Sequence, residues 1–232
     1  MKNVFVLLFL FGNSIIYAQD GLFIEPVVGA GLSSTSVHYS EFKFKDVPKF
    51  TFNPQLLLGY KYHNFIFKTG IGYLKTGSTG IVYEGFLSEI STIQYQYNNY
   101  LTIPLSVAYN FPISPRLSIV PGVSYSLGFL TSTESSVVID YSASPASSYL
   151  SSDAFIMKRP ASGTNSFAGI QVEADYKINS NFYISAGPEA QYKFSPTFPD
   201  NTDFFRPYTY TLNVGLKYCF AQKHAESITQ SK

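Results

Sequence analysis

The chain has 232 residues, of which 17% are aromatic and 13% are charged, and its formal net charge is +1. A nearly neutral chain lacks the basic surface that nucleic acid requires, so a nucleic-acid-binding role is excluded. The single cysteine, Cys219, excludes an internal disulfide, and beyond the N-terminal segment no apolar run reaches the roughly 18 residues of a membrane-spanning helix.

The first segment in chain order has the pattern of a secretory signal peptide. Lys2 supplies a positive charge, Val4–Phe11 form a short apolar core, and the small residue Ala18 precedes Gln19. A membrane-anchoring helix would need about 20 apolar residues, and the polar pair at 13–14 ends this run too early. We therefore expect residues 1–18 to be a signal peptide that is cleaved before Gln19.

Eight later segments alternate apolar and polar side chains with a period of two, which is typical of strands with one apolar face. In chain order they are residues 22–32, 50–62, 65–75, 100–111, 116–129, 167–178, 182–194 and 208–220. Each has close to the roughly 9–11 residues that a tilted strand needs to cross a bilayer.

The last segment shows the pattern most clearly. Its even positions are all apolar or aromatic: Tyr208, Tyr210, Leu212, Val214, Leu216, Tyr218 and Phe220. Its odd positions carry no large apolar side chain. Aromatic residues at both ends of an apolar face are typical of a strand that meets lipid and places its rings at the two headgroup layers.

Strand charges fall on the opposite face, which we expect to line the lumen of a closed barrel. They are Glu25, Lys61, Lys68, Arg116, Glu173, Asp175, Lys177, Glu189, Lys193 and Lys217, while Lys75 at a strand end is an exception. A charge on the lipid face at mid-membrane costs about 2–4 kcal/mol, so a membrane would impose this sorting. We expect Glu173 and Asp175 to form ion pairs with Lys177, Lys193 and Arg116.

The connections alternate between short and long. Short polar turns are predicted at 63–64, 112–115 and 179–181, and long connections at 37–49, 76–99, 130–166 and 195–207. This asymmetry is typical of outer-membrane barrels, and an even strand number places both termini on the short-turn, periplasmic side. Residues 78–99 are expected to extend a barrel hairpin past the membrane, and the serine-rich residues 130–166 to form a flexible surface loop.

The predicted fold is all-β: an eight-stranded antiparallel, up-and-down transmembrane β-barrel over residues 19–220, followed by a short periplasmic tail at 221–232. An alternative with ten strands would use Val137–Ile139 in an extra hairpin. A soluble barrel of the lipocalin type, with its apolar face inside, is a second alternative.

One strand carries a family resemblance. Residues 100–111, with the sequence YLTIPLSVAYNF, resemble the fourth strand of the PorT-like outer-membrane β-barrels of the Bacteroidota. The segments Arg116–Val123 and Pro26–Gly31 are also similar to that family. The resemblance implies an eight-stranded barrel in the outer membrane and no reaction. The name-giving member assists protein secretion, and no residue here carries that role over. In many such barrels the chain ends on an aromatic residue, whereas here the tail follows Phe220.

No catalytic, cofactor-binding or metal-binding residue is expected. His38, His63 and His224 are far apart and share no metal-binding spacing. Glu173 and Asp175 could form a catalytic carboxylate pair, but a lumenal ion network explains them better. Cys219 is expected to be a small inward-facing side chain near the periplasmic end.

The expected function is to anchor surface-exposed loops in the outer membrane, for binding or for envelope structure, without catalysis. The expected partners are outer-membrane lipid, the barrel insertion machinery, and an extracellular or envelope partner of the long loops. A small porin-like pore and an accessory role in protein secretion across the outer membrane are the alternatives. An eight-stranded barrel is narrow enough for its side chains to fill it, which argues against the pore.

Overall fold

The computed structural model describes residues 21–36, 44–46, 48–83, 91–140, 155–160, 163–194 and 206–220. This part of the chain forms eleven β-strands. They are β1 (Leu22–Ser36), β2 (Phe44–Asp46), β3 (Lys49–Tyr62), β4 (Phe65–Tyr83), β5 (Ser91–Tyr109), β6 (Phe111–Pro112), β7 (Leu117–Asp140), β8 (Phe155–Pro160), β9 (Thr164–Lys177), β10 (Phe182–Lys193) and β11 (Arg206–Cys219).

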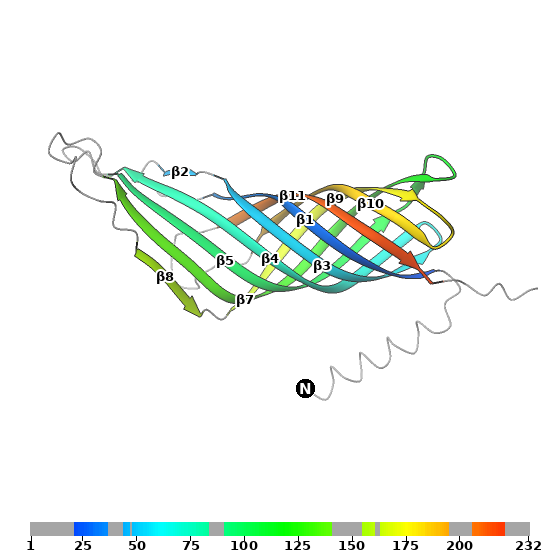
Figure 1. Cartoon of the computed structure of the whole chain (residues 1–232), viewed down its shortest axis with the longest axis horizontal. Coiled ribbons are helices and arrows are strands. Elements are labelled where there is room, and N and C mark those ends of the chain that lie inside the picture. Colours follow the sequence, from blue (N-terminus) through cyan, green and yellow to red (C-terminus); the bar gives the residue numbers. More distant parts are fainter. Residues whose placement is uncertain are drawn as a thin grey trace, which may run out of the picture.

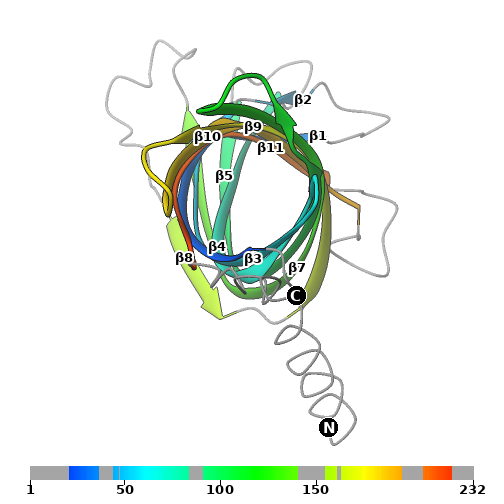
Figure 2. The ribbon, with the colours of Figure 1, turned by 90° about the vertical axis from the view of Figure 1, so that its right-hand side faces the viewer.

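Eight of these strands form a closed antiparallel barrel. Around the ring the order is β1, β3, β4, β5, β7, β9, β10 and β11, and β11 pairs with β1 to close it. Figure 1 shows the barrel from the side, and Figure 2 shows the ring of strands from the short-turn end. The three other strands only extend it, because β2 pairs with β4 while β6 and β8 pair with β7.

The predicted strand positions are confirmed, and the prediction of eight barrel strands is correct. The ten-stranded alternative is wrong, because Val137–Ile139 continue β7 and pair with β5 at Gln94–Thr92. The short strand β8 pairs with β7 outside the ring.

β4, β5 and β7 are much longer than predicted, and β1 continues to Ser36 instead of residue 32. The hairpin of β4 and β5 continues to the pair Tyr83 and Ser91, so the prediction that residues 78–99 extend a barrel hairpin is confirmed for 78–83 and 91–99, and β7 accompanies β5 to that end. The prediction of a flexible loop over 130–166 is wrong for residues 130–140, 155–160 and 164–166, which lie in β7, β8 and β9. The serine-rich composition suggested a loop, but β5 supplies backbone partners along this stretch as far as Asp140.

The barrel places its apolar face outside and its charges inside. Outward side chains such as Ile170, Leu212 and Val214 are 67%, 59% and 51% exposed, whereas the inward Lys68 and Lys217 are each 4% exposed. A protein dissolved in water shows the opposite arrangement. The lipocalin-type alternative is therefore wrong, because the apolar face lies outside.

Glycine allows neighbouring strands to approach closely at lumenal positions such as Gly31 and Gly187. A Cβ atom added to Gly31 would lie 1.9 Å from the carbonyl oxygen of Tyr210, and one added to Gly187 would lie 1.9 Å from that of Val172. Real Cβ atoms do not come this near to backbone, so any other residue would push the strands apart.

The three short turns lie at the same end of the barrel as the start of β1 and the end of β11 (Figure 1). At the tightest turn His63 has a φ of 55°, in the left-handed region that histidine tolerates better than most residues. Asn110 N donates a hydrogen bond of 2.7 Å to Asn64 O, which joins this turn to the end of β5.

Several predictions fall outside the described residues. These are the signal peptide at 1–18, the tail at 221–232, and the positions of His38 and His224. Among the residues that the structure does describe, no helix has the length and apolar character needed to cross a membrane.

The outward face yields a test of depth on one strand. Val172 in the middle of β9 and Ile178 just past its end are 47% and 50% exposed on the same face. If this face meets lipid, Val172→Arg should destabilise the folded barrel by about 2–4 kcal/mol and Ile178→Arg by about 0–1 kcal/mol. Guanidinium titration in lipid vesicles measures both. Equal, small effects would mean that water covers the face.

Candidate functional site

The centre of the lumen holds a buried ionic cluster. The Lys68 ammonium on β4 lies 3.0 Å from Glu25 Oε2 on β1 and 2.6 Å from Glu173 Oε2 on β9. The hydroxyl of Ser185 on β10 donates a hydrogen bond of 2.5 Å to Glu25 Oε1. The charged side chains of this cluster are almost fully buried, so the cluster links distant strands across the lumen.

A second ion pair lies nearer the short-turn end. The Lys217 ammonium on β11 is 2.5 Å from Asp175 Oδ2 on β9. The same ammonium lies 5.1 Å from the centroid of the Phe23 ring, within the range of a cation–π contact. The side chains of Lys217 and Asp175 are both buried.

Glu189 on β10 is held by neutral donors instead of a lysine. Ser124 Oγ and Gln191 Nε2 donate to Oε1 at 3.0 and 2.8 Å, and Asn213 Nδ2 donates to Oε2 at 2.8 Å. Three donors from three strands satisfy a charge that would be costly to bury alone.

The predicted partners of the lumenal carboxylates need correction. Glu173 and Asp175 pair with Lys68 and Lys217, not with Lys177, Lys193 and Arg116 as predicted. Lys177 lies on β9 with both carboxylates, and Lys193 lies on the adjacent β10 but pairs with Phe167 at its other end, whereas Lys68 reaches Glu173 from β4 across the lumen. The period of two identified Lys68 and Lys217 as inward-facing, but it could not show which strands face each other.

Two apolar layers bracket the ionic cluster along the lumen. Toward the short-turn end, buried apolar side chains pack together, with Cys219 against them; they are Phe23, Ile66, Ala108 and Val120. Toward the long connections, the other layer consists of Leu74, Tyr100 and Phe167. The rings of Tyr100 and Phe167 pack edge-to-face, with their centroids 5.3 Å apart. The inward placement of Cys219 is confirmed.

Side chains of the described residues thus cross the lumen, with ion pairs at its centre and an apolar layer on either side of them. Among the described residues, no group of three or more histidine, cysteine or acidic side chains could hold a metal ion. His63 lies in the β3–β4 turn, away from the ionic cluster. The lysines neutralise the neighbouring carboxylates and tie the wall of the barrel together.

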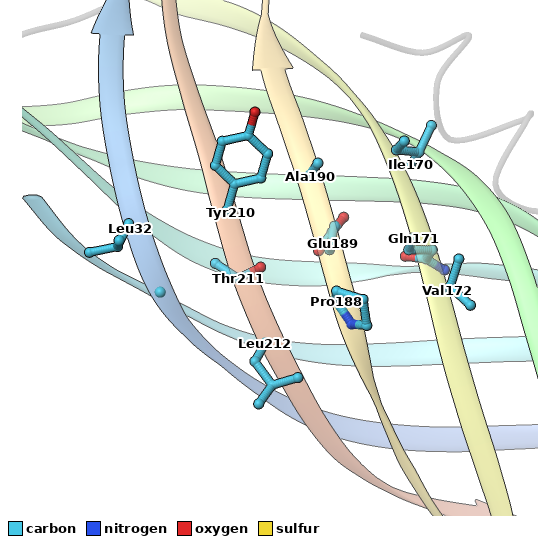
Figure 3. A pocket seen from close by; sticks show the side chains of 11 residues that line it. Leu32, Ile170, Gln171, Val172, Pro188, Glu189, Ala190, Tyr210, Thr211 and Leu212 are labelled. Atoms are coloured by element: carbon cyan, nitrogen blue, oxygen red, sulfur yellow. The ribbon is translucent and has the colours of Figure 1, made fainter. Parts of the chain in front are cut away.

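The outer face carries an apolar hollow of about 480 Å³ across β1, β9, β10 and β11. Figure 3 shows small side chains on β10, Pro188 and Ala190, between the larger Tyr210 and Ile170 on the flanking strands. The polar neighbours in the same view, such as Glu189, are buried on the lumenal side. Apart from its backbone and the Tyr210 hydroxyl, the hollow is lined by hydrocarbon, so it offers a polar substrate few hydrogen-bonding partners.

The comparisons with known proteins concern the whole barrel. The model of the outer membrane protein beta-barrel domain family matches residues 5–220. No curated protein matches the chain.

Several solved structures are similar at low identity. Neisserial surface protein A is 17% identical, with 86% of this chain and 97% of that chain covered and a TM-score of 0.44. A major outer membrane protein from Thermus thermophilus is 13% identical, with 86% of this chain and 99% of that chain covered and a TM-score of 0.46. The outer membrane protease OmpT from Escherichia coli is 11% identical, with 88% of this chain and 98% of that chain covered and a TM-score of 0.39.

The shared lysine yields a test of the ionic cluster. Lys68→Met should destabilise the barrel by about 3–5 kcal/mol, because it leaves the buried carboxylates of Glu25 and Glu173 without their cation. Adding Glu25→Gln and Glu173→Gln to this variant should restore most of the loss. The midpoints of guanidinium unfolding measure both changes. An unchanged midpoint in the single variant would show that the cluster does not form.

Proposed function

The chain belongs to the outer membrane protein beta-barrel domain family, and we propose that it anchors a surface-exposed β-platform and its loops in the outer membrane. The platform serves binding or envelope structure, and no catalytic step is assigned to it. We define the platform as residues 78–83 of β4, 91–96 of β5 and 135–140 of β7, together with β2 and β8.

The observation that carries this proposal is the unequal length of the strands. β4 and β5 have 19 residues each and β7 has 24, whereas β10 has 12. A tilted strand crosses the hydrocarbon with roughly 9–11 residues. The excess lies wholly at the end with the long connections, where these strands run past β1, β9, β10 and β11 (Figure 1).

A filled lumen supports anchoring over transport. The ionic cluster of Lys68, Glu25 and Glu173 crosses the interior, and the two apolar layers lie on either side of it. An eight-stranded barrel has an interior just wide enough for its side chains to fill. A porin-like pore would need a polar path along the lumen that these layers interrupt.

We further propose that both termini face the periplasm and that the long connections face outward. The start of β1 and the end of β11 lie with the short turns, as is typical of the termini of bacterial outer-membrane barrels. In this orientation the barrel insertion machinery and outer-membrane lipid are partners of the barrel, and an extracellular or envelope component is the partner of the platform.

A narrower relationship to the PorT-like barrels of the Bacteroidota stays a prediction. The segment that carries that resemblance, residues 100–111, lies in β5 and the start of β6. These residues form part of the barrel wall, so they support a structural relationship more than a shared role in protein secretion.

Surface exposure of the platform can be tested by labelling intact cells. In a Cys219→Ser background, Ser148→Cys in the connection after β7 should react fully with a membrane-impermeant maleimide. Ser180→Cys in the β9–β10 turn should react only after the outer membrane is permeabilised, since it lies at the opposite end. The reverse pattern would contradict the proposed orientation.

The filled lumen predicts no stable conductance. The purified protein should give no steps in planar bilayers, because the side chains of the two apolar layers and the ionic cluster occupy the interior. Lys68→Met with Glu173→Gln serves as a comparison in which the ionic cluster is removed. Regular, long-lived channels from the unaltered protein would contradict the anchoring proposal and favour the porin-like pore.

A further inference from the structure

The short-turn end of the barrel opens into a cavity of about 290 Å³, here named the mouth cavity. Phe23 and Ile66, from the apolar layer at this end of the lumen, form part of its lining. The rest of the lining comes mainly from the turn between β6 and β7 and from the ends of β3, β9, β10 and β11. The cavity is therefore separate from the ionic cluster deeper in the lumen.

Cations dominate the lining of the mouth cavity. Four basic side chains line it, against one carboxylate: Lys61, Arg116, Lys177 and Lys217, with Asp175. The carboxylate is already paired with Lys217 at 2.5 Å. The whole chain has a formal net charge of only +1, so this is a strong local excess of positive charge.

The other three cations have no acidic partner in the described part of the chain. Lys61, Arg116 and Lys177 make no ion pair there, and the Lys177 ammonium lies 6.0 Å from the Tyr183 ring centroid. Lys68 at the centre of the lumen is, by contrast, paired with the carboxylates of Glu25 and Glu173. Like charges that share a small cavity repel one another, and an anion between them would relieve that repulsion.

Strand alternation shows that these lysines do not simply reach the surrounding lipid. Tyr62 and Tyr176, the neighbours of Lys61 and Lys177, are 51% and 46% exposed on the outer face. Because successive side chains point to opposite faces, the two lysines lie on the lumenal side. Their ammonium groups therefore belong to the mouth of the barrel and not to its lipid-facing surface.

We propose that the mouth cavity binds an oxyanion, specifically a phosphate group. Lysine and arginine donors suit phosphate, and the planar arginine fork can contact two of its oxygens. Neutral side chains that can donate hydrogen bonds, Asn110, Ser118 and Tyr183, line the same cavity. The phosphate can come from free inorganic phosphate or from the headgroup of an anionic phospholipid. This inference depends on the closed barrel and not on the function of the platform.

Phosphorus NMR tests the inference on the full chain purified from membranes in nonionic detergent. One arm titrates inorganic phosphate, and the other uses mixed micelles that contain phosphatidylglycerol. The mouth variant combines Lys61→Gln, Arg116→Gln and Lys177→Gln. The control variant combines Lys45→Gln, Lys49→Gln and Lys75→Gln, which removes the same charge at the other end of the barrel.

The unaltered protein and the control should broaden the phosphorus signal of at least one probe, and the mouth variant should bind it about tenfold more weakly or worse. Binding of inorganic phosphate identifies a free anion, and binding of phosphatidylglycerol alone identifies a lipid headgroup. Failure to bind either probe, or an equal loss in both variants, overturns the inference. Heat-modifiable migration on a gel checks folding, and the single Lys177→Gln variant, with a smaller loss, serves if the triple variant does not fold.

Discussion

The pairing of β1 with β11 closes the sheet, and the rest of the structure depends on that closure. The two strands are in register from Phe23 with Cys219 to Ser36 with Arg206. In hydrocarbon no water is present to bond with free N–H and C=O groups, so an open sheet edge would be costly. Closure supplies each of the eight barrel strands with a partner on both sides. The outer side chains of these strands can therefore be apolar.

Closure with eight strands also determines the interior. A ring this narrow brings side chains from opposite walls into contact, as in the pair of Lys68 on β4 and Glu173 on β9. Charges that must face inward to avoid lipid can therefore neutralise each other. A ring of eight strands has an interior just wide enough for side chains to fill, and the platform and the mouth cavity are the two places where we propose that the protein meets other molecules.

The sequence predicted the faces of the strands well and their partners across the lumen poorly. Period-two alternation is a local property, so the inward placement of Lys68, Lys217 and Cys219 followed from it directly. Which inward side chains meet depends on strand tilt and register around the ring, and no local pattern encodes these. The partners Lys177, Lys193 and Arg116 were chosen for Glu173 and Asp175 without that information, and the structure shows Lys68 and Lys217 instead.

The extension of β7 to Asp140 was missed for a related reason, since its serine-rich sequence resembles a loop and only the pairing with β5 makes it a strand. The mouth cavity likewise could not be predicted, because Lys61, Arg116 and Lys177 are far apart in sequence and meet only where a turn and several strand ends converge.

The central claim is that the apolar flank of the strands touches hydrocarbon and the polar flank is enclosed. Spin labels on single cysteines at Tyr210, Thr211, Leu212 and Asn213, in a Cys219→Ser background in lipid vesicles, test it most directly. Labels at 210 and 212 should collide often with oxygen, which dissolves in lipid, and rarely with a water-soluble nickel complex. A high nickel collision rate at 212 would show water on that flank and would contradict the account.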